Sequence, residues 1–294
     1  MTSTNRAVRI ASILLCLAVF ASASFAAKTN PLKYPSGLAV DTAGNLWVAN
    51  NSDNEILVFS DTYKQLPAQT ITEGIDAPTG LAFDSLGNLW VANNGNNTVT
   101  EYTGGAQDMG ATITNGISQP ESIAVDGLND VWVANTFNAD GGGYDTSFTV
   151  YAPSTVYGPG SKLMMTFGPY PTLLYGIVVS DGAFVYGDGN DLNLTPASEA
   201  IATGSVSGVN VGGNNTAVWV ASDTNGTIYF TTTNNAVNFA QPSSLGAASQ
   251  LLELSFAPSG IAVDSVHGRI YISNGPGNAI EVYSLSGTFL KTIN

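Results

Sequence analysis

The stretch GLAVDTAGNLWVANN at residues 37–51 returns as GLAFDSLGNLWVANN at residues 80–94 and as SIAVDGLNDVWVANT at residues 122–136. Each copy contains two short apolar runs rich in β-forming residues, and a turn with Asp, Gly or Asn separates them. After the first copy, EILVFS at residues 55–60 and QTIT at residues 69–72 supply two more short runs. The sequence therefore predicts a repeated unit of four β-strands.

Six units follow when the aromatic residue of the second strand is used as the marker of each unit. The markers are Trp47, Trp90, Trp132, Phe184, Trp219 and Tyr271, and the intervals between them are 43, 42, 52, 35 and 52 residues. A period in the forties made of short strands is typical of propeller blades. The strands are apolar on both faces, as expected when each sheet packs between two neighbours. We therefore predict an all-β fold, a six-bladed β-propeller of four-stranded antiparallel blades, with these aromatic side chains packed between blades.

The N-terminal segment has the pattern of a secretory signal peptide. It carries Arg6 and Arg9, then an apolar run of 11 residues from Ile10 to Phe20, then small residues from Ala23 to Ala27. A membrane-spanning helix needs roughly 20 residues, so we expect no membrane anchor after the signal is removed. The expected organisation is a signal peptide at residues 1–27 and a propeller at residues 28–294, with a secreted or periplasmic location.

Charge limits the classes of partner. Without Arg6 and Arg9 the chain keeps 6 of its 8 Lys and Arg residues against 22 Asp and Glu, a net charge of −16. Because nucleic acids and anionic membranes are bound through clustered Lys and Arg, we expect neither as a partner. The only cysteine, Cys16, lies within the signal. The mature chain therefore offers no disulfide and no thiol nucleophile.

Three units carry a longer shared pattern. They are PSGLAVDTAGNLWVANNSDNEILVF at residues 35–59, PTGLAFDSLGNLWVANNGNNTVTEY at residues 78–102 and PSGIAVDSVHGRIYISNGPGNAIEVY at residues 258–283. This pattern resembles the NHL repeat. The resemblance implies a six-bladed propeller but no single activity, because function belongs to sites rather than to folds.

Two enzyme families with related propellers bear on the site. Streptogramin lyases resemble this chain in blade pattern and use histidine as acid or base. The only histidine here, His267, lies in DSVHGRI, the turn that joins the first two strands of the last unit. In a propeller this turn lies on the face opposite the one where the first strands begin, so we expect His267 to be a solvent-facing turn residue.

Gluconolactonase-type propellers hold a divalent cation in the central channel with Glu, Asn and Asp. The positions here that match that channel precede the glycine of each first strand or end each second strand. The first set is Ser36, Thr79, Glu121, Tyr175, Ser207 and Ser259, and the second set is Asn50, Asn93, Asn135, Gly187, Ser222 and Asn274. Glu121 is the one carboxylate in either set, whereas a hard dication prefers several charged oxygen ligands. We therefore expect no cofactor, with a divalent cation such as Ca²⁺ as the alternative.

The expected ligand site is the mouth of the channel, with Asn50, Asn93, Glu121, Asn135 and Asn274 as its members. Asn at a strand end can also begin a turn, so a structural role for the asparagines stays open. The predicted function is a secreted, non-catalytic binding or scaffold module for a protein or a polar small molecule. The alternative is a metal-dependent lactonase-like hydrolase, or a lyase-like enzyme, that uses the same mouth.

The signal peptide generates the first prediction. We expect exported protein to begin close to residue 28, because the small residues from Ala23 to Ala27 provide the cleavage region. Intact-mass measurement of the exported protein checks this, and the variant Leu15→Arg, which interrupts the apolar run, is the export-blocked control. Exported protein that still carries Met1 would contradict the expected cleavage.

Overall fold

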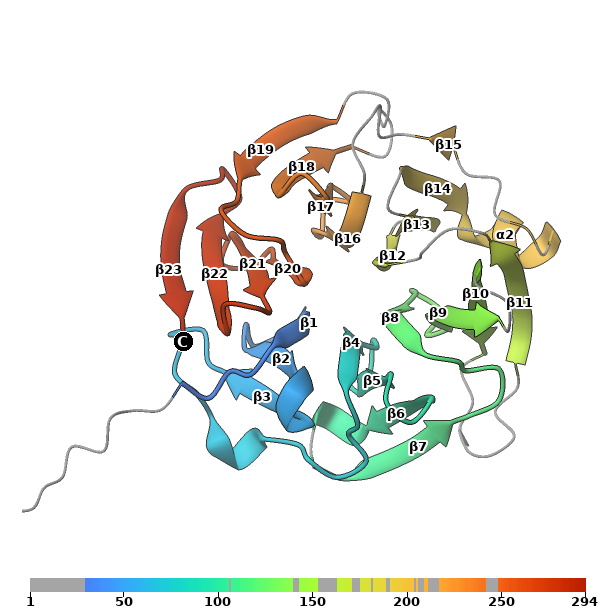
Figure 1. Cartoon of the computed structure of the whole chain (residues 1–294), viewed down its shortest axis with the longest axis horizontal. Helices are drawn as coiled ribbons and strands as arrows, with labels where there is room; N and C mark the ends of the chain where they lie inside the picture. The colour runs from blue at the N-terminus through green and yellow to red at the C-terminus, as the bar shows by residue number, and fades with distance from the viewer. Residues whose placement is uncertain are drawn as a thin grey trace, which may run out of the picture. The chain divides into compact units, whose positions relative to one another are not determined.

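The computed structural model describes residues 30–105, 107–139, 143–152, 163–170, 175–180, 182–188, 191–203, 205, 209–210, 217–241 and 248–294. The predicted signal peptide lies outside these residues. Residues Leu32–Asn294 form one compact unit. Its strands make six antiparallel sheets that follow one another around a central axis, and the last sheet lies beside the first (Figure 1). The predicted six-bladed β-propeller is confirmed.

The chain order assigns the strands to blades as follows. Blade 1 contains β1 (Pro35–Val40), β2 (Leu46–Asn50) and β3 (Glu55–Phe59), and blade 2 contains β4 (Pro78–Phe83), β5 (Leu89–Asn93), β6 (Thr98–Tyr102) and β7 (Met109–Ile113). Blade 3 contains β8 (Pro120–Val125), β9 (Val131–Ala139), β10 (Gly143–Tyr151) and β11 (Leu163–Tyr170), and blade 4 contains β12 (Ile177–Ser180), β13 (Ala183–Gly187), β14 (Leu192–Pro196) and β15 (Val209–Asn210). Blade 5 contains β16 (Ala217–Ser222), β17 (Ile228–Thr232), β18 (Ala236–Ala240) and β19 (Ser249–Glu253), and blade 6 contains β20 (Gly260–Asp264), β21 (Arg269–Asn274), β22 (Ala279–Ser284) and β23 (Phe289–Ile293).

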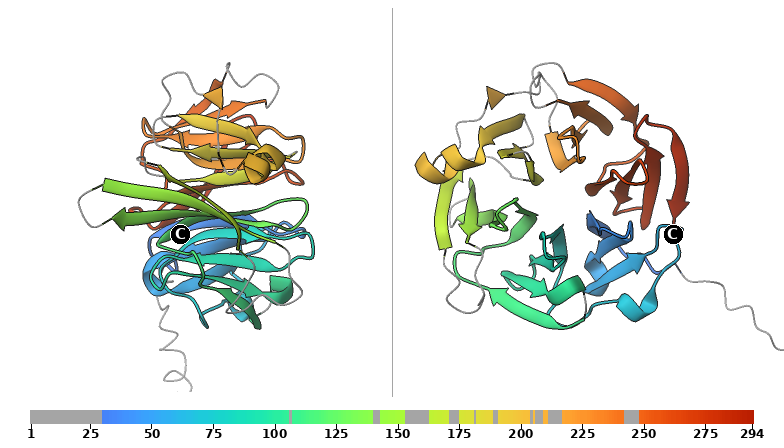
Figure 2. Two further views of the ribbon diagram at one scale, coloured as in Figure 1. Left: turned by 90° about the vertical axis from the view of Figure 1, so that its right-hand side faces the viewer. Right: turned by 180° about the vertical axis from the view of Figure 1, so that it is seen from behind.

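The first strand of every blade is the innermost one, and the later strands step outward to the rim, as the views from the side and from behind show (Figure 2). Short helical segments interrupt this pattern at η1 (Asn51–Asp53), η2 (Pro67–Gln69), η3 (Thr103–Gly105) and α2 (Ala197–Thr203). The helix α2 was not expected from the sequence. None of the helices in the described part of the chain has the length and apolar character needed to cross a membrane.

Blade 1 departs from the four-stranded pattern that the other five blades follow. Its regular sheet has three strands, and its outer segment pairs with β3 only through the isolated bridges Ile56–Ile71 and Phe59–Gln65. Between these bridges, Pro67 begins η2. Because proline has no backbone N–H to donate to a ladder, a continuous fourth strand does not form here.

Blade 5 corrects the sequence prediction. The sequence pattern predicts Trp219 on a second strand, but it lies on β16, the innermost strand, and the second strand β17 carries Tyr229 instead. With Tyr229 as the marker, the last two intervals change from 35 and 52 residues to 45 and 42. The error arose because AVWVAS on β16 has the same apolar composition as LWVAN on β2.

The same correction explains β18. Ala236–Ala240, with the sequence AVNFA, pairs with β17 in the sheet of blade 5. It is the third strand of the blade once Trp219 is assigned to the first strand. Ser222, which was expected to end a second strand, ends the first strand β16. Ser207 lies outside the described residues.

The tryptophans of the first three blades pack between blades, as predicted. Trp47, Trp90 and Trp132 are at most 3% exposed. Trp90 shares an apolar cluster with Val131 and Val133 of the next blade, and the Trp132 ring stacks on Phe184 of blade 4 at 4.7 Å between centroids. These rings fill the space that the divergent sheets leave between them.

Close backbone approach joins the innermost strands. A Cβ atom at Gly37 would lie 2.3 Å from the carbonyl oxygen of Thr79, and one at Gly260 would lie 2.3 Å from the carbonyl oxygen of Ser36. Both distances are far shorter than a carbon–oxygen contact allows, so these positions need glycine. The contact between Gly260 and Ser36 joins blade 6 to blade 1. The last and first blades therefore meet through the same kind of backbone contact as blades 1 and 2.

The packing of Trp90 gives the second prediction. Replacing Trp90 by Ala should lower the free energy of unfolding by ~3–5 kcal/mol, because the change leaves a cavity between blades 2 and 3. Chemical denaturation of both proteins measures this difference. The control is Leu86→Ala, whose side chain is 77% exposed and whose loss should change stability by less than ~0.5 kcal/mol. Equal midpoints for Trp90→Ala and wild type would contradict the packing.

Candidate functional site

The central channel is narrow at the level of the glycines. The space there is about 50 Å³, and residues from all six innermost strands line it. Below the glycine level the inward-facing residues include Leu38, Leu81, Ile123, Ile177, Val220 and Ile261. Small-molecule sites usually have volumes of roughly 300–1,000 Å³. A ligand at this end of the channel must therefore sit on the mouth rather than inside it.

A set of hydrogen bonds, which we call the mouth links, joins neighbouring blades around this opening. In blades 1, 2 and 6 a hydroxyl group donates to the proline carbonyl of the next blade. The bonds are Ser36 Oγ to Pro78 O at 2.8 Å, Thr79 Oγ1 to Pro120 O at 2.7 Å and Ser259 Oγ to Pro35 O at 2.8 Å. Each of these residues directly precedes a glycine of an innermost strand. The side chain at this position is thus a connector of the ring.

Glu121 occupies the connector position of blade 3. Its Oε1 atom accepts a hydrogen bond from Nδ2 of Asn94 in blade 2 at 3.1 Å. Burial raises the pKa of the Glu121 carboxyl, and the hydrogen bond from Asn94 offsets part of that rise. A carboxyl group with a raised pKa holds its proton at higher pH than usual, so it can donate as well as accept hydrogen bonds there.

Trp219 makes the link between blades 5 and 6 in a different way. It stands in the register that Gly37, Gly80 and Gly260 hold in their blades, and its indole Nε1 donates to Pro258 O at 3.2 Å. Gly176 of blade 4 makes room for it, because a Cβ there would lie 2.7 Å from the Trp219 Cα atom. The Trp219 ring meets the ring of Tyr175 edge-on, with centroids 6.3 Å apart. Blades 4 and 5 therefore place two aromatic side chains at the mouth.

Three of the predicted site asparagines tie each blade to the connection that enters it. Asn50, Asn93 and Asn135 are fully buried. Their Oδ1 atoms accept from the backbone N–H of the residue 17 positions earlier, and the bonds are Lys33 N to Asn50 at 2.6 Å, Asp76 N to Asn93 at 3.1 Å and Ser118 N to Asn135 at 3.0 Å. Their Nδ2 atoms donate within the blade, to Glu55 Oε1, Thr100 Oγ1 and Thr149 Oγ1.

The fourth predicted asparagine, Asn274, is partly exposed, and its Oδ1 accepts from the N–H of Gly277 at 2.9 Å. It therefore caps the turn between β21 and β22. A ligand could reach the three buried amides only by breaking the bonds described above. Contact between a ligand and any of these asparagines stays a prediction.

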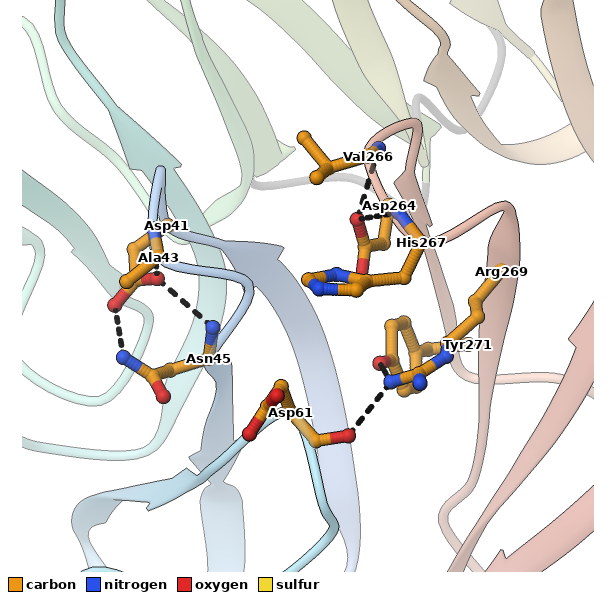
Figure 3. Close-up of polar contacts among 9 residues, drawn as sticks. All are labelled: Asp41, Ala43, Asn45, Asp61, Asp264, Val266, His267, Arg269 and Tyr271. Atoms are coloured by element: carbon orange, nitrogen blue, oxygen red, sulfur yellow. Dashed lines mark hydrogen bonds and ion pairs between the residues drawn. The ribbon is translucent and has the colours of Figure 1, made fainter.

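His267 lies on the turn between β20 and β21, at the opposite end of β20 from Ser259. Its Nδ1 lies 2.8 Å from Oδ2 of Asp264, whose Oδ1 accepts from the backbone N–H groups of Val266 and His267 (Figure 3). A Cβ at Gly44 of blade 1 would lie 2.3 Å from the His267 Cε1 atom. The imidazole is thus packed across the junction of blades 6 and 1, with its side chain 31% exposed.

Arg269 strengthens the same junction. Its Nη1 donates to the carbonyl oxygen of Asp61 at 2.7 Å (Figure 3). Its guanidinium also lies 4.9 Å from the centre of the Tyr63 ring. Lys291 lies 5.2 Å from the same ring.

No group of three or more His, Cys, Asp or Glu suited to a metal ion occurs among the residues that the structure describes.

Comparison with known proteins agrees with this geometry. The NHL repeat profile matches residues 32–59 and 76–102. No curated protein sequence matches the chain. Among solved structures, a streptogramin B lyase aligns with a TM-score of 0.61 at 14% identity, covering 90% of this chain and 84% of the lyase. A structure of a nidogen/laminin complex aligns with a TM-score of 0.64 at 12% identity, covering 82% and 90%.

A third structure of the same fold is a catalytically inactive virginiamycin B lyase from Staphylococcus aureus with quinupristin. It aligns with a TM-score of 0.60 at 15% identity, covering 89% of this chain and 85% of the lyase. At these identities the likeness concerns the fold. Together with the match of residues 32–59 and 76–102 to the NHL repeat, it supports a β-propeller that contains NHL repeats.

The buried asparagines give the third prediction. Asn135→Ala should lower the free energy of unfolding by ~1–3 kcal/mol, because the Ser118 N–H and the Thr149 hydroxyl lose a buried partner. Asn274→Ala, at a partly exposed turn, is the matched control and should have the smaller effect. Denaturation curves for the two variants decide the matter, and a larger loss for Asn274→Ala would refute the structural role assigned to Asn135.

Proposed function

We propose that this NHL-repeat propeller is a secreted, non-catalytic binding module that holds a polar ligand at the channel mouth. The ligand is a small molecule or the equivalent group on a partner protein. One observation carries the proposal: the regular mouth is interrupted on blades 3 and 5 by Glu121 and Trp219, and Tyr175 lies on blade 4 between them.

The other blades show which side chains are sufficient to close the ring. Blades 1, 2 and 6 close with Ser, Thr and Ser in the connector position. A carboxyl group is not required there. In blade 5, Trp219 occupies the position that glycine holds in blades 1, 2 and 6. Its indole donates one hydrogen bond to blade 6 and also adds a large apolar surface at the mouth. Residues that depart from a structural pattern at an opening are candidates for recognition.

The chemistry of these residues indicates the kind of ligand. The Glu121 carboxyl and the Asn94 amide offer hydrogen-bond acceptors and donors within 3.1 Å of each other. Tyr175 and Trp219 offer aromatic faces, which bind flat or weakly polar surfaces well. Binding sites commonly combine apolar walls with a few convergent polar groups. A sugar or another polyol ring, with hydroxyl groups on its edge and an apolar face, fits both halves of the mouth.

Two further facts support a role in binding outside the cell. The pattern of residues 1–27 is that of a signal peptide. One of the structures with the same fold comes from a complex between nidogen and laminin, which is a protein–protein assembly. A propeller of this fold therefore occurs in an assembly with a partner protein.

A catalytic alternative rests on Glu121. Two structures of the same fold are lyases, and a carboxyl group whose pKa is raised by burial is suited to general acid–base work. Incubation of the exported protein with quinupristin and with glucono-δ-lactone separates the two functions. The binding proposal predicts no turnover above that of buffer. Turnover that disappears in Glu121→Gln would overturn it in favour of the enzyme.

The mouth site gives the fourth prediction. The chain has four tryptophans, so its indole N–H resonances form a simple reporter set. In a titration with mono- and disaccharides, a ligand should shift the Trp219 resonance and leave those of the buried Trp47, Trp90 and Trp132 in place. Glu121→Gln should weaken the binding by about tenfold through the altered hydrogen bonds.

The matched control for Glu121→Gln is Glu101→Gln. Glu101 is on β6, away from the mouth, and burial likewise raises the pKa of its carboxyl. It should leave saccharide affinity unchanged. A ligand that shifts the other three indoles, or whose affinity responds to Glu101→Gln but not to Glu121→Gln, would place binding elsewhere.

A further inference from the structure

The turn between the first and second strands is built in the same way in blades 1, 2 and 3. One aspartate, Asp41, Asp84 or Asp126, caps it. The Oδ1 atom accepts from the backbone N–H groups two and four residues later, and Oδ2 accepts from a tryptophan indole at 3.0–3.3 Å. In blades 1 and 2 an asparagine completes the turn, because Asn45 and Asn88 each donate Nδ2 to the same Oδ2 at 2.9 Å.

Blade 3 has Asp130 where the other two blades have asparagine. Its backbone N–H still donates to Asp126 Oδ1 at 2.9 Å. Its carboxylate, however, has no donor to offer, and across the described residues it takes part in no hydrogen bond or ion pair. The residue is only 5% exposed. A second carboxyl group therefore lies beside Asp126, at the position where blades 1 and 2 have an amide that donates to the capping aspartate.

This arrangement opposes ionisation of Asp130. Burial, and secondly the charge of Asp126, raise the pKa of the Asp130 carboxyl to about 6. At neutral pH most Asp130 side chains are nevertheless ionised, so the folded protein holds here a negative charge to which no described residue supplies a hydrogen bond or an opposite charge. Such a charge is costly unless something positive pairs with it.

A cavity opens beside these acids. It has a volume of about 780 Å³ and lies between the turn of blade 3 and the elements of blade 4. Asp126, Leu128 and Asp130 line it from the turn, Val179 lines it from β12, and Ala197 and Ile201 line it from α2. The walls are mainly apolar apart from the two carboxylates and the Ser198 hydroxyl. Its size is that of sites for small organic molecules.

We propose that this cavity binds a small organic monoamine, with its ammonium group paired to Asp130 and its apolar body against Leu128, Val179 and Ile201. Charge complementarity argues for a cation, and the apolar walls argue for an organic one. A hard metal ion would need more oxygen ligands than Asp130 and the already hydrogen-bonded Asp126 supply. The site is on the turn side of the propeller, at the other end of β8 from Glu121, and is independent of the proposed mouth site.

The proposal has a definite dependence on pH. Among the residues that line the cavity, Asp126 and Asp130 are the titratable ones. Ammonium binding requires Asp130 to be ionised, so the affinity should fall as the pH is lowered from neutral to about 5 and Asp130 takes up a proton. Because a bound ammonium stabilises the ionised form, occupancy should also release protons near the pKa of Asp130.

The test is calorimetric titration of the exported protein with phenethylamine, with phenethyl alcohol as a neutral compound of nearly the same shape. The amine should bind and the alcohol should not. Asp130→Asn recreates the asparagine of blades 1 and 2. It should weaken amine binding by at least about tenfold, because the buried charge partner is gone, and it should raise the midpoint of thermal unfolding at neutral pH.

Asn88→Asp is the matched control. It creates the acid pair in blade 2, so it should lower the unfolding midpoint at neutral pH while leaving the affinity for phenethylamine unchanged. Three results would each overturn the proposal: no binding of phenethylamine to the wild-type protein at neutral pH, equal binding of phenethyl alcohol, or an affinity that Asp130→Asn leaves unchanged. None of these results bears on the mouth site, whose readout is saccharide binding and its response to Glu121→Gln.

Discussion

The contact between neighbouring innermost strands at the channel mouth is the constraint on which the rest of the structure depends. Glycines such as Gly37 and Gly260 allow backbone contacts that a Cβ atom would forbid, and the mouth links add one hydrogen bond from a hydroxyl to the next proline carbonyl. The same two devices join blade 6 to blade 1. Because the ring closes through contacts of this kind, each sheet can diverge outward, and the space between sheets is filled by large aromatic side chains such as Trp90 and Trp132.

Most polar residues of the repeat have a structural role in forming the blades and closing the ring. The capping aspartates hold the turns, Asn50, Asn93 and Asn135 hold the incoming connections, and the hydroxyls hold the ring. Residues without such a structural role are recognised because they differ from the residues at the same position in the other blades. Glu121 and Trp219 depart at the mouth, and Asp130 departs at the turn side. The two proposed sites rest on these departures, because in each case sister blades show the residue that structure alone would select.

The amino-acid sequence predicted the blade architecture because the period and the apolar runs report strand packing directly. It could not place Trp219, since a strand buried on both faces has the same composition whether it is the first or the second of its blade. The intervals of 35 and 52 residues were the signal of that error. Asn50, Asn93 and Asn274 were correctly placed at strand ends, whereas β9 continues past Asn135 to Ala139. The hydrogen bonds that hold Asn50, Asn93 and Asn135 come from backbone groups 17 residues away. The cavity beside Asp126 and Asp130 depends on α2, which helical periodicity did not reveal.

The position of Trp219 on the innermost strand, open to the mouth, is the central claim, because both the blade register and the proposed site follow from it. Quenching of tryptophan fluorescence by acrylamide tests it directly in the wild-type protein and in Trp219→Phe. Trp47, Trp90 and Trp132 are at most 3% exposed, so the account predicts that the quenchable component of the wild-type emission disappears in Trp219→Phe. An equally quenchable emission in the variant would contradict it, since Trp219 would then be packed between blades like the other three.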